Sequence, residues 1–174
     1  FGDRVASIDR DGKTLTTDSG KQFAYDKLVL ATGSYPFVPP VKGNDLEPCV
    51  VYRTIDDLGI IQAQAKGGKV GVVVGGGLLG LECANAVKNL GLETHVVEFA
   101  PGLMGVQLDG GGSAMLRRKI EALGVTVHTG KATQVIEQDA LGESRLRMQF
   151  ADGGSLATDM IVFSAGIRPY DQLA

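Results

Sequence analysis

The spacing of apolar and polar residues changes along the chain and divides it into regions of different predicted structure. Residues 1–30 are predicted to form an antiparallel β-meander, because apolar positions alternate with polar ones at its start and Asp-Gly and Ser-Gly turns follow. From residue 50 to residue 128 short β-branched runs alternate with segments of helical period, as in a parallel sheet with helical connections. The two-residue period returns over residues 131–157. The pattern therefore predicts an α/β protein with a Rossmann-like parallel sheet and a three-stranded antiparallel β-meander.

Two apolar runs that end in small residues are predicted as buried strands. Residues 26–30 lead into Ala31-Thr32-Gly33, and residues 160–164 lead into Ala165-Gly166. The carboxyl end of a buried parallel strand offers backbone N–H groups to a ligand. Taken alone, however, the Ala-Thr-Gly sequence fits an ordinary strand-to-loop exit better than a ligand site.

The most informative stretch is residues 70–82, in which a β-branched run ends in glycines that open an amphipathic segment. Gly75, Gly77 and Gly80 have the G-x-G-x-x-G spacing of a dinucleotide-binding turn. In such a turn the first glycine allows the tight turn, the second lets the backbone approach a pyrophosphate, and the third lets the helix pack on the strand. The pyrophosphate then lies at the helix N-terminus, where unpaired N–H groups and the helix dipole favour negative charge.

The residues after the glycines strengthen this prediction. A helix is predicted to end at Gly91, with an apolar stripe formed by Leu81, Ala84, Val87 and Leu90. Residues 94–97 then form a second predicted strand, which ends at Glu98, 23 residues after Gly75. In dinucleotide-binding domains an acidic residue about 20 residues after the glycines binds the adenosine ribose. We therefore predict a nucleotide site made by the glycine turn and Glu98.

Other local signals place the remaining elements. Thr54 is a predicted helix cap, for a helix that runs to about Lys66. A later helix is predicted to end at Gly124, and its buried face carries Leu116, Ile120 and Leu123. The best candidate for a domain boundary is a stiff connector that contains Pro36, Pro39 and Pro40.

Composition argues against several classes of protein. At 174 residues, with 44% hydrophobic and 21% charged residues, the chain has the composition of a globular domain. Its net charge of −3 gives no basis for a nucleic-acid partner, and no apolar run approaches the length of about 18 residues that a membrane span needs. Cys49 and Cys83 form neither a disulfide framework nor a C-x-x-C pair, so a cytoplasmic location is expected. Because no terminal signal is visible, we expect the chain to be cut from a longer protein.

Together these motifs resemble those of the pyridine nucleotide-disulfide oxidoreductase superfamily, flavoprotein reductases that have two dinucleotide-binding domains. The resemblance rests on the Ala-Thr-Gly of residues 31–33, the Gly-Gly-Gly-x-x-Gly-x-Glu of residues 75–82 and the Ala-Gly-Ile-Arg-Pro of residues 165–169. Within the superfamily, the chain is most similar to the NAD(P)H-dependent assimilatory nitrite reductase large subunit family. The segments that carry this similarity are residues 31–40, 52–54, 75–82, 95–101 and 116–121.

The resemblance implies that a nicotinamide domain is inserted into an FAD domain. Residues 1–36 would then be the C-terminal portion of the first segment of an FAD-binding domain, residues 37–166 the NAD(P)H-binding domain, and residues 167–174 the start of the return to the FAD domain. The first G-x-G-x-x-G of the family, which holds the FAD pyrophosphate, is absent from this sequence. The iron–sulfur and sirohaem modules that reduce nitrite are absent as well. We therefore expect this chain to bind NADH but to carry no FAD.

The predicted cofactor-binding residues come from the glycine turn, the acidic strand end and the two strand exits. They are Gly75, Gly76, Gly77, Leu78, Leu79, Gly80, Glu82, Glu98, Phe99, Gly166, Thr32 and Gly33. NADH is expected to bind better than NADPH, because an ionised Glu98 repels a ribose 2′-phosphate and no arginine follows it over residues 99–101. For Glu82 two interpretations stay open. It complements the helix dipole, or, as the resemblance implies, it lies near the nicotinamide ribose and the flavin.

The other chemistry-bearing residues have simpler interpretations, and no catalytic side chain or metal ligand is predicted. The run Arg117-Arg118-Lys119, with Glu121 one helical turn after Arg117, predicts a solvated helix face. His95 and His128 lie in strand patterns without a second ligand at metal spacing, so both are predicted to be structural.

The leading functional interpretation is an electron-input module that docks NADH for hydride transfer to FAD in a nitrite reductase, which converts nitrite to ammonia. The predicted partners are NAD(P)H, the remainder of the parent chain and a nitrite reductase small subunit. Two alternatives are a ferredoxin or rubredoxin reductase and an NADH oxidase domain, which would use the same kind of site. A third is a non-catalytic NADH-sensing module.

Overall fold

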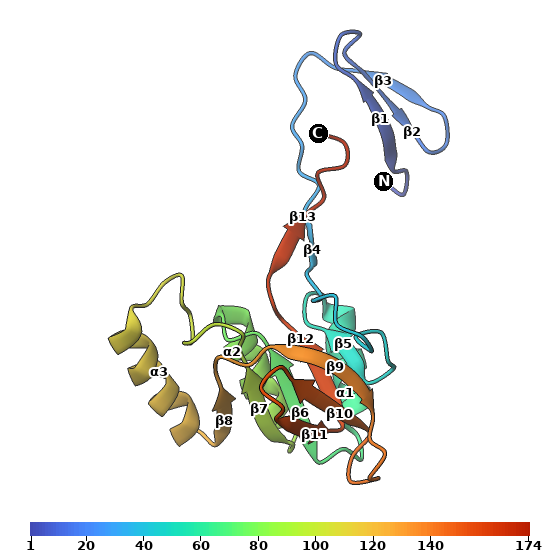
Figure 1. Cartoon of the computed structure of the whole chain (residues 1–174). Coiled ribbons are helices and arrows are strands. Elements are labelled where there is room, and N and C mark those ends of the chain that lie inside the picture. The colour runs from blue at the N-terminus through green and yellow to red at the C-terminus, as the bar shows by residue number, and fades with distance from the viewer. The chain divides into compact units, whose positions relative to one another are not determined.

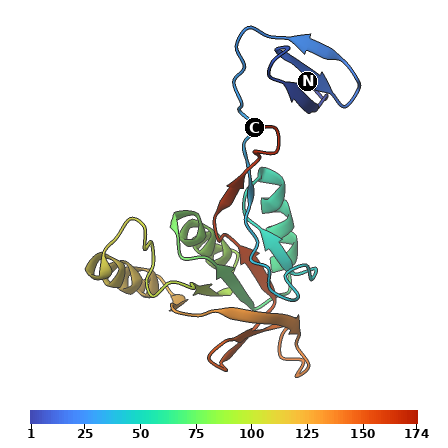
Figure 2. The ribbon, with the colours of Figure 1, turned by 45° about the horizontal axis from the view of Figure 1, so that its top comes forward.

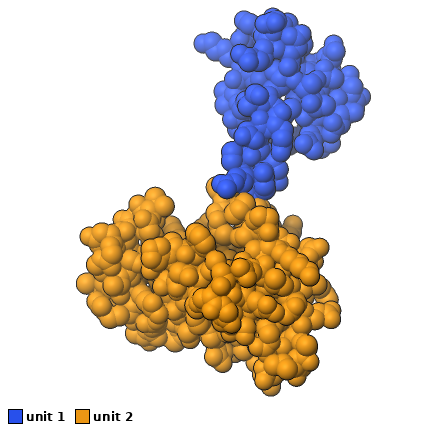
Figure 3. Space-filling model, in the orientation of Figure 1, with its two compact units in different colours: residues 1–35, 168–174 blue, residues 36–167 orange.

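The computed structural model describes residues 1–174, and the chain divides into two compact units (Figure 3). The first unit contains residues 1–35 and 168–174, and the second contains residues 36–167. Two short strands, β4 (Ser34–Pro36) and β13 (Ile167–Pro169), pair with each other where the chain passes between the units. No helix of the chain is both long and apolar enough to cross a membrane.

The first unit is built on an antiparallel meander. Its strands are β1 (Val5–Asp9), β2 (Thr14–Thr17) and β3 (Gln22–Ala24), in the order β1-β2-β3. The turn between β1 and β2 is closed by the Asp9 carboxylate, which accepts hydrogen bonds from the N–H groups of Asp11 and Gly12. The meander predicted for the N-terminal residues is therefore confirmed.

The buried strand predicted over residues 26–30 is wrong. These residues form no strand, and their side chains are exposed, with Val29 at 84% and Leu30 at 47%. Their apolar sequence is typical of a strand covered on both faces, but such a strand is stable only between paired neighbours. No strand of the chain pairs with this segment, so it is not part of a sheet and its side chains stay exposed.

The second unit contains a five-stranded parallel sheet in the order β5-β12-β6-β7-β8 (Figure 1). The strands are β5 (Cys49–Val51), β6 (Val70–Val74), β7 (Glu93–Val97), β8 (Val125–His128) and β12 (Met160–Phe163). β-branched residues dominate because both faces of the sheet are covered. Successive side chains therefore enter two different cores, with Val73, Val96 and Val162 in one and Val72, Val97 and Ile161 in the other.

Helices cover one face of this sheet, and an antiparallel meander covers the other (Figure 2). The helices are α1 (Ile55–Ala65), α2 (Leu78–Asn89) and α3 (Gly110–Ala122). The meander contains β9 (Thr133–Gln138), β10 (Leu146–Phe150) and β11 (Ser155–Thr158), in the order β11-β10-β9. This arrangement of layers confirms the predicted fold class.

The helix ends follow largely from local sequence. Thr54 and Asp57 form a capping box at the start of α1, where each side chain accepts a hydrogen bond from the backbone N–H of the other residue. Leu123 was predicted on a buried helix face, and this prediction is wrong, since its side chain is 60% exposed. Leu90, on the apolar stripe predicted for α2, is 40% exposed. Each is the C-cap residue of its helix, where the helical period that sets the stripe has ended.

One buried carboxylate, which the sequence pattern did not single out, joins three segments of the second unit. Asp159 lies between β11 and β12 and is 8% exposed. Its Oδ2 accepts hydrogen bonds from the backbone N–H groups of Lys69 (2.6 Å) and Val70 (3.0 Å). Its Oδ1 accepts one from the N–H of Arg145 (3.2 Å). Burial opposes ionisation, but the three donors outweigh it and hold the pKa of the Asp159 carboxyl below its ordinary value.

Replacing this carboxylate tests its role. We expect Asp159→Ala to lower the free energy of unfolding at pH 7 by about 3 kcal/mol, because buried N–H groups lose their acceptor. Since the folded pKa lies below the unfolded value of about 3.9, this contribution is complete above about pH 5 and is lost as the pH falls through the folded pKa. Urea denaturation between pH 7 and pH 3 measures it.

The matched control is Asp56→Ala, at an exposed aspartate in the first turn of α1, which should cost less than about 1 kcal/mol. A loss from Asp159→Ala that stays constant down to pH 3 would contradict the ionic role.

Candidate nucleotide-binding site

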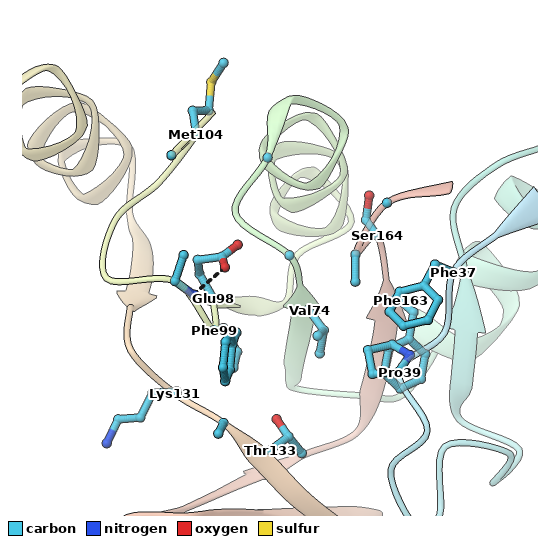
Figure 4. A pocket seen from close by; sticks show the side chains of 18 of the residues that line it. Phe37, Pro39, Val74, Glu98, Phe99, Met104, Lys131, Thr133, Phe163 and Ser164 are labelled. Carbon is cyan, nitrogen blue, oxygen red and sulfur yellow. Dashed lines mark hydrogen bonds between the residues drawn. The ribbon is translucent and has the colours of Figure 1, made fainter. Parts of the chain in front are cut away.

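A cavity of about 800 Å³ opens in the second unit at the carboxyl ends of β12, β6 and β7 (Figure 4). The last residues of these three strands, Phe163, Val74 and Val97, form part of its wall. The rest of the wall comes from the loops that follow the strands, from residues 131–133, where β9 begins, and from Phe37, Pro39 and Val41. Glu98 and Lys131 are the only charged side chains in this otherwise largely apolar lining.

The order of the strands explains this location. From β6 the chain proceeds through α2 to β7 and through α3 to β8 on one side, whereas β12 and β5 lie on the other side of β6. The sheet therefore changes its direction of winding at β6. In open parallel sheets, ligands bind beyond the carboxyl ends of the strands at such a switch point.

The three glycines of the fingerprint have the surroundings that a dinucleotide-binding turn requires. Gly75 has a φ of +120°, which side chains rarely allow, and a Cβ there would overlap the carbonyl oxygen of Ser164. A Cβ on Gly80 would overlap the carbonyl oxygen of Gly75, so the third glycine lets α2 pack directly on the turn. A Cβ on Gly77 would meet no atom within 4 Å, and this residue lines the cavity. The middle position is therefore the one left open for a ligand.

Helix α2 begins at this open position. Gly77 is its N-cap and supplies no side-chain hydrogen bond, so no capping oxygen satisfies the first N–H groups of the helix. The positive end of the helix dipole lies at the same place. A phosphate group would accept hydrogen bonds from these N–H groups and would be stabilised by the dipole.

Glu98 follows β7 at the cavity and is held by both its side chain and its main chain. Its Oε2 accepts a hydrogen bond from the Gly76 N–H at 2.6 Å, and its Oε1 accepts one from the Ala100 N–H at 2.7 Å. Its own N–H donates to the carbonyl of His128, and its carbonyl accepts from the N–H of Lys131. The spacing of 23 residues between Gly75 and Glu98 predicted that Glu98 binds a ribose, but it did not predict the hydrogen bond between Glu98 and the glycine turn.

The structure places the predicted cofactor-binding residues in three groups. Those that line the cavity are Gly75, Gly77, Glu98, Phe99 and Gly166. Those in the turn or in α2 that do not line it are Gly76, Leu78, Leu79, Gly80 and Glu82, the last of which is exposed.

The third group, Thr32 and Gly33, belongs to the first unit. Both residues are exposed and bond to the backbone of Tyr170. The Thr32 hydroxyl donates to the Tyr170 carbonyl at 2.5 Å, and the Gly33 carbonyl accepts from the Tyr170 N–H at 3.0 Å.

Sequence reasoning missed several residues that line the cavity. They are Phe37, Pro39, Met104, Lys131, Thr133, Phe163 and Ser164, all labelled in Figure 4. For Phe163 and Ser164 the sequence did contain a signal, because both lie at the end of a strand that was predicted to be buried. The Lys131 ammonium pairs with the Asp152 carboxylate and lies 5.5 Å from the centre of the Phe150 ring. Nothing in the sequence pointed to Lys131, because its position depends on which strands become neighbours.

The histidines and cysteines do not form a second site. The rings of His95 and His128 stack, and Nδ1 of His95 lies 3.0 Å from Nε2 of His128. No group of three His, Cys, Asp or Glu residues is placed to hold a metal ion. Both cysteines are free thiols, and burial raises the pKa of Cys49 to about 11 and that of Cys83 to about 12. Because the thiolate is the reactive form, both thiols are expected to be inert.

The basic run of α3 is solvated as predicted at Arg118 and Lys119, whereas Arg117 is only partly exposed. Arg117 forms the expected ion pair with Glu121, at 2.8 Å. The same guanidinium also donates to the carbonyl of Val127 at 2.9 Å and so bonds α3 to β8. Arg117 therefore has a structural role in addition to its surface ion pair.

The fold and the glycine turn are those of a known family. The profile of the family described as pyridine nucleotide-disulphide oxidoreductase matches residues 1–174, and the chain belongs to this family. It is 64% identical over 174 residues to the NAD(P)H nitrite reductase large subunit of Klebsiella oxytoca. It is 57% identical over 173 residues to the NADH nitrite reductase large subunit of Escherichia coli strain K12.

These alignments cover 100% and 99% of this chain but 18% and 20% of the two relatives, so the chain spans about a fifth of their length. A solved structure, that of an NAD-dependent persulfide reductase from A. fulgidus, superposes with a TM-score of 0.89 at 30% identity and covers 99% of this chain and 32% of that one. The predicted family is therefore confirmed. Complete proteins of this family bind NAD(P)H and FAD.

Two glycine variants separate packing from ligand approach at the turn. Gly80→Ala should lower the free energy of unfolding by about 2 kcal/mol or more, because its Cβ overlaps the Gly75 carbonyl. Gly77→Ala should cost less than about 1 kcal/mol. However, it should weaken binding of a nicotinamide nucleotide by roughly tenfold, because its methyl group occupies the open side of the turn. Thermal denaturation and fluorescence titration measure the two effects. Equal losses of stability, or unchanged binding by Gly77→Ala, would refute this division of roles.

Proposed function

We propose that residues 37–166 form the NADH-binding domain of a flavoprotein reductase and dock NADH for hydride transfer to FAD. The observation that carries this proposal is the open Gly77 at the N-terminus of α2, beside the Glu98 carboxylate at the same cavity. A helix N-terminus suits a pyrophosphate, and a carboxylate at the end of the next strand suits a ribose. The cavity, at about 800 Å³, has the size of a cofactor site.

In the proposed complex the pyrophosphate lies at Gly77 and at the first N–H groups of α2. The adenosine ribose donates to Glu98, whose two oxygens each accept one N–H and keep a lone pair for a further donor. The adenine lies against Phe99, which is 77% exposed. The nicotinamide lies toward Gly166, at the end of β12, with Glu82 near its ribose.

The residues of this chain do not form a pyrophosphate site for FAD. The first unit contains the Thr32-Gly33 segment but no helix, so it lacks the glycine turn and helix N-terminus that carry a dinucleotide. We assign residues 1–36 and 167–174 to an FAD domain that the remainder of the parent protein completes. The flavin supplies the hydride acceptor, whereas this chain binds NADH and orients it.

We further propose that the parent protein is a nitrite reductase large subunit, because the similarity to two such subunits extends over the whole chain. The iron–sulfur cluster, the sirohaem and the reduction of nitrite to ammonia then belong to other domains of that protein. The proposed partners of the chain are NADH, the remainder of the parent chain and a nitrite reductase small subunit, in the cytoplasm.

Titration of NADH and of NADPH onto the chain tests the proposal. We expect NADH to bind at least about tenfold more tightly, because the ionised Glu98 accepts a bond from the ribose 2′-hydroxyl and repels a 2′-phosphate. Nucleotide fluorescence measures both dissociation constants. Glu98→Gln should reduce the preference for NADH over NADPH. Glu121→Gln, the same change on α3, should leave this preference unchanged. Equal affinities in the unmodified chain would remove Glu98 from this role, and no binding of either nucleotide would overturn the proposed function.

A further inference from the structure

The second residue of the glycine turn is held by groups that lie after β7. The Gly76 N–H donates to Glu98 Oε2 at 2.6 Å, and the Gly76 carbonyl accepts from the Met104 N–H at 2.9 Å. A Cβ on Gly76 would lie 2.6 Å from Leu103 Cδ2 and 3.1 Å from Glu98 Cβ. Both side chains therefore pack against its Cα. The peptide groups on either side of Gly76 are fixed from outside the turn itself.

The segment that supplies these groups is also fixed. The Ala100 N–H donates to Glu98 Oε1 at 2.7 Å, and the Ala100 carbonyl accepts from the Gly130 N–H at 2.8 Å. Leu103 is completely buried. Met104 has a φ of +50°, a left-handed conformation that is strained for a residue with a side chain. Such strain persists only where surrounding contacts enforce it, and it is concentrated at ligand sites.

We propose that Glu98 is a positioning residue for the pyrophosphate-binding turn in addition to being a ligand of the ribose. Glu98, Leu103 and Met104 form a latch that sets the orientation of the two peptide groups that flank Gly76. This inference rests on the proposed NADH site and adds one requirement to it. Affinity for the nucleotide depends on Glu98 even when the adenosine ribose has no hydroxyl groups.

Glu98→Gln is the variant that tests the latch. The carboxylate accepts hydrogen bonds from two backbone N–H groups, one at each oxygen. An amide of the same shape must turn its NH₂ group toward one of these donors, so one of the two bonds is lost. The variant therefore disturbs the turn whether or not a ribose hydroxyl is present.

The probes are NADH and an NADH analogue that carries 2′,3′-dideoxyadenosine. If Glu98 serves only the ribose, Glu98→Gln binds the analogue as tightly as the unmodified chain does. If the latch positions the turn, the variant binds the analogue about tenfold more weakly, the effect expected of a lost hydrogen bond to a charged group. The affinity of the variant for NADH then falls by a larger factor, because the contact with the ribose is lost as well.

A second variant acts on the latch without contacting the nucleotide. Leu103 is completely buried and does not line the cavity. Leu103→Ala should therefore weaken the binding of NADH and of the analogue by the same factor, about threefold or more. Leu146, in β10, is 1% exposed and lies outside the cavity lining. Leu146→Ala is therefore the matched control, which should lower stability to a similar extent and leave both affinities unchanged.

Amide hydrogen exchange in the nucleotide-free chain gives a readout that a ribose contact cannot affect. Exchange at Gly76 and Ala100 should be at least about tenfold faster in Glu98→Gln than in the unmodified chain, with unchanged exchange at Val73 in the sheet. Unchanged exchange at Gly76, together with equal affinity of both proteins for the analogue, would overturn the latch. If the unmodified chain binds neither nucleotide, the proposed NADH site is wrong, while the exchange experiment still decides whether Glu98 positions the turn.

Discussion

The close approach of α2 to β6 is the constraint on which the rest of the second unit depends. Two glycines make it possible. A Cβ on Gly71 would lie 2.6 Å from Val87 Cγ1, and a Cβ on Gly80 would overlap the carbonyl oxygen of Gly75. Because the helix lies directly on the strand, its N-terminus meets the carboxyl end of the sheet with no intervening side chain. The same packing that closes the core therefore creates an anion-binding end beside an open cavity.

The two covered faces of the sheet contribute differently to this cavity. The helical face sets the position of the glycine turn through the packing of Cys83, Ala84 and Val87 of α2 in the core. The meander on the other face supplies the opposite wall, because residues 131–133 lead from β8 into β9. Asp159 joins the start of β6 to the segments before β10 and β12, so the sheet and the meander are held in register by one ionised group. The cavity is thus a product of all three layers.

What the sequence predicts well is local. The glycine turn, its helix and Glu98 lie within one βαβ unit, so fixed spacings carry the information about their arrangement. The strand predicted over residues 26–30 fails for the opposite reason. Its apolar pattern is real, but burial requires neighbouring strands, and none pairs with it. Phe37 and Lys131 could not be predicted to line the cavity, since they reach it only through the order in which distant strands pair.

The bond from Gly76 to Glu98 illustrates the same limit at a finer scale. The spacing of the two residues is part of the fingerprint, yet the spacing alone assigns Glu98 to the ligand. Only the three-dimensional structure shows that the Glu98 carboxylate accepts hydrogen bonds from two backbone N–H groups of the protein itself. Likewise, the strained φ of Met104 has no signature in sequence, because strain is imposed by surroundings rather than by residue type.

We propose that NADH binds at the carboxyl edge of the parallel sheet, and the function assigned to the chain depends on this site. The most direct measurement is an NMR titration of the isotope-labelled chain with NADH, following the backbone amide signal of each residue. If NADH binds at this edge, the largest shifts occur at Gly77, at the first residues of α2 and at Glu98 and Phe99, and the signals of β1 and β2 are unchanged. Saturable shifts confined to the first unit, with the glycine turn unaffected, would contradict it.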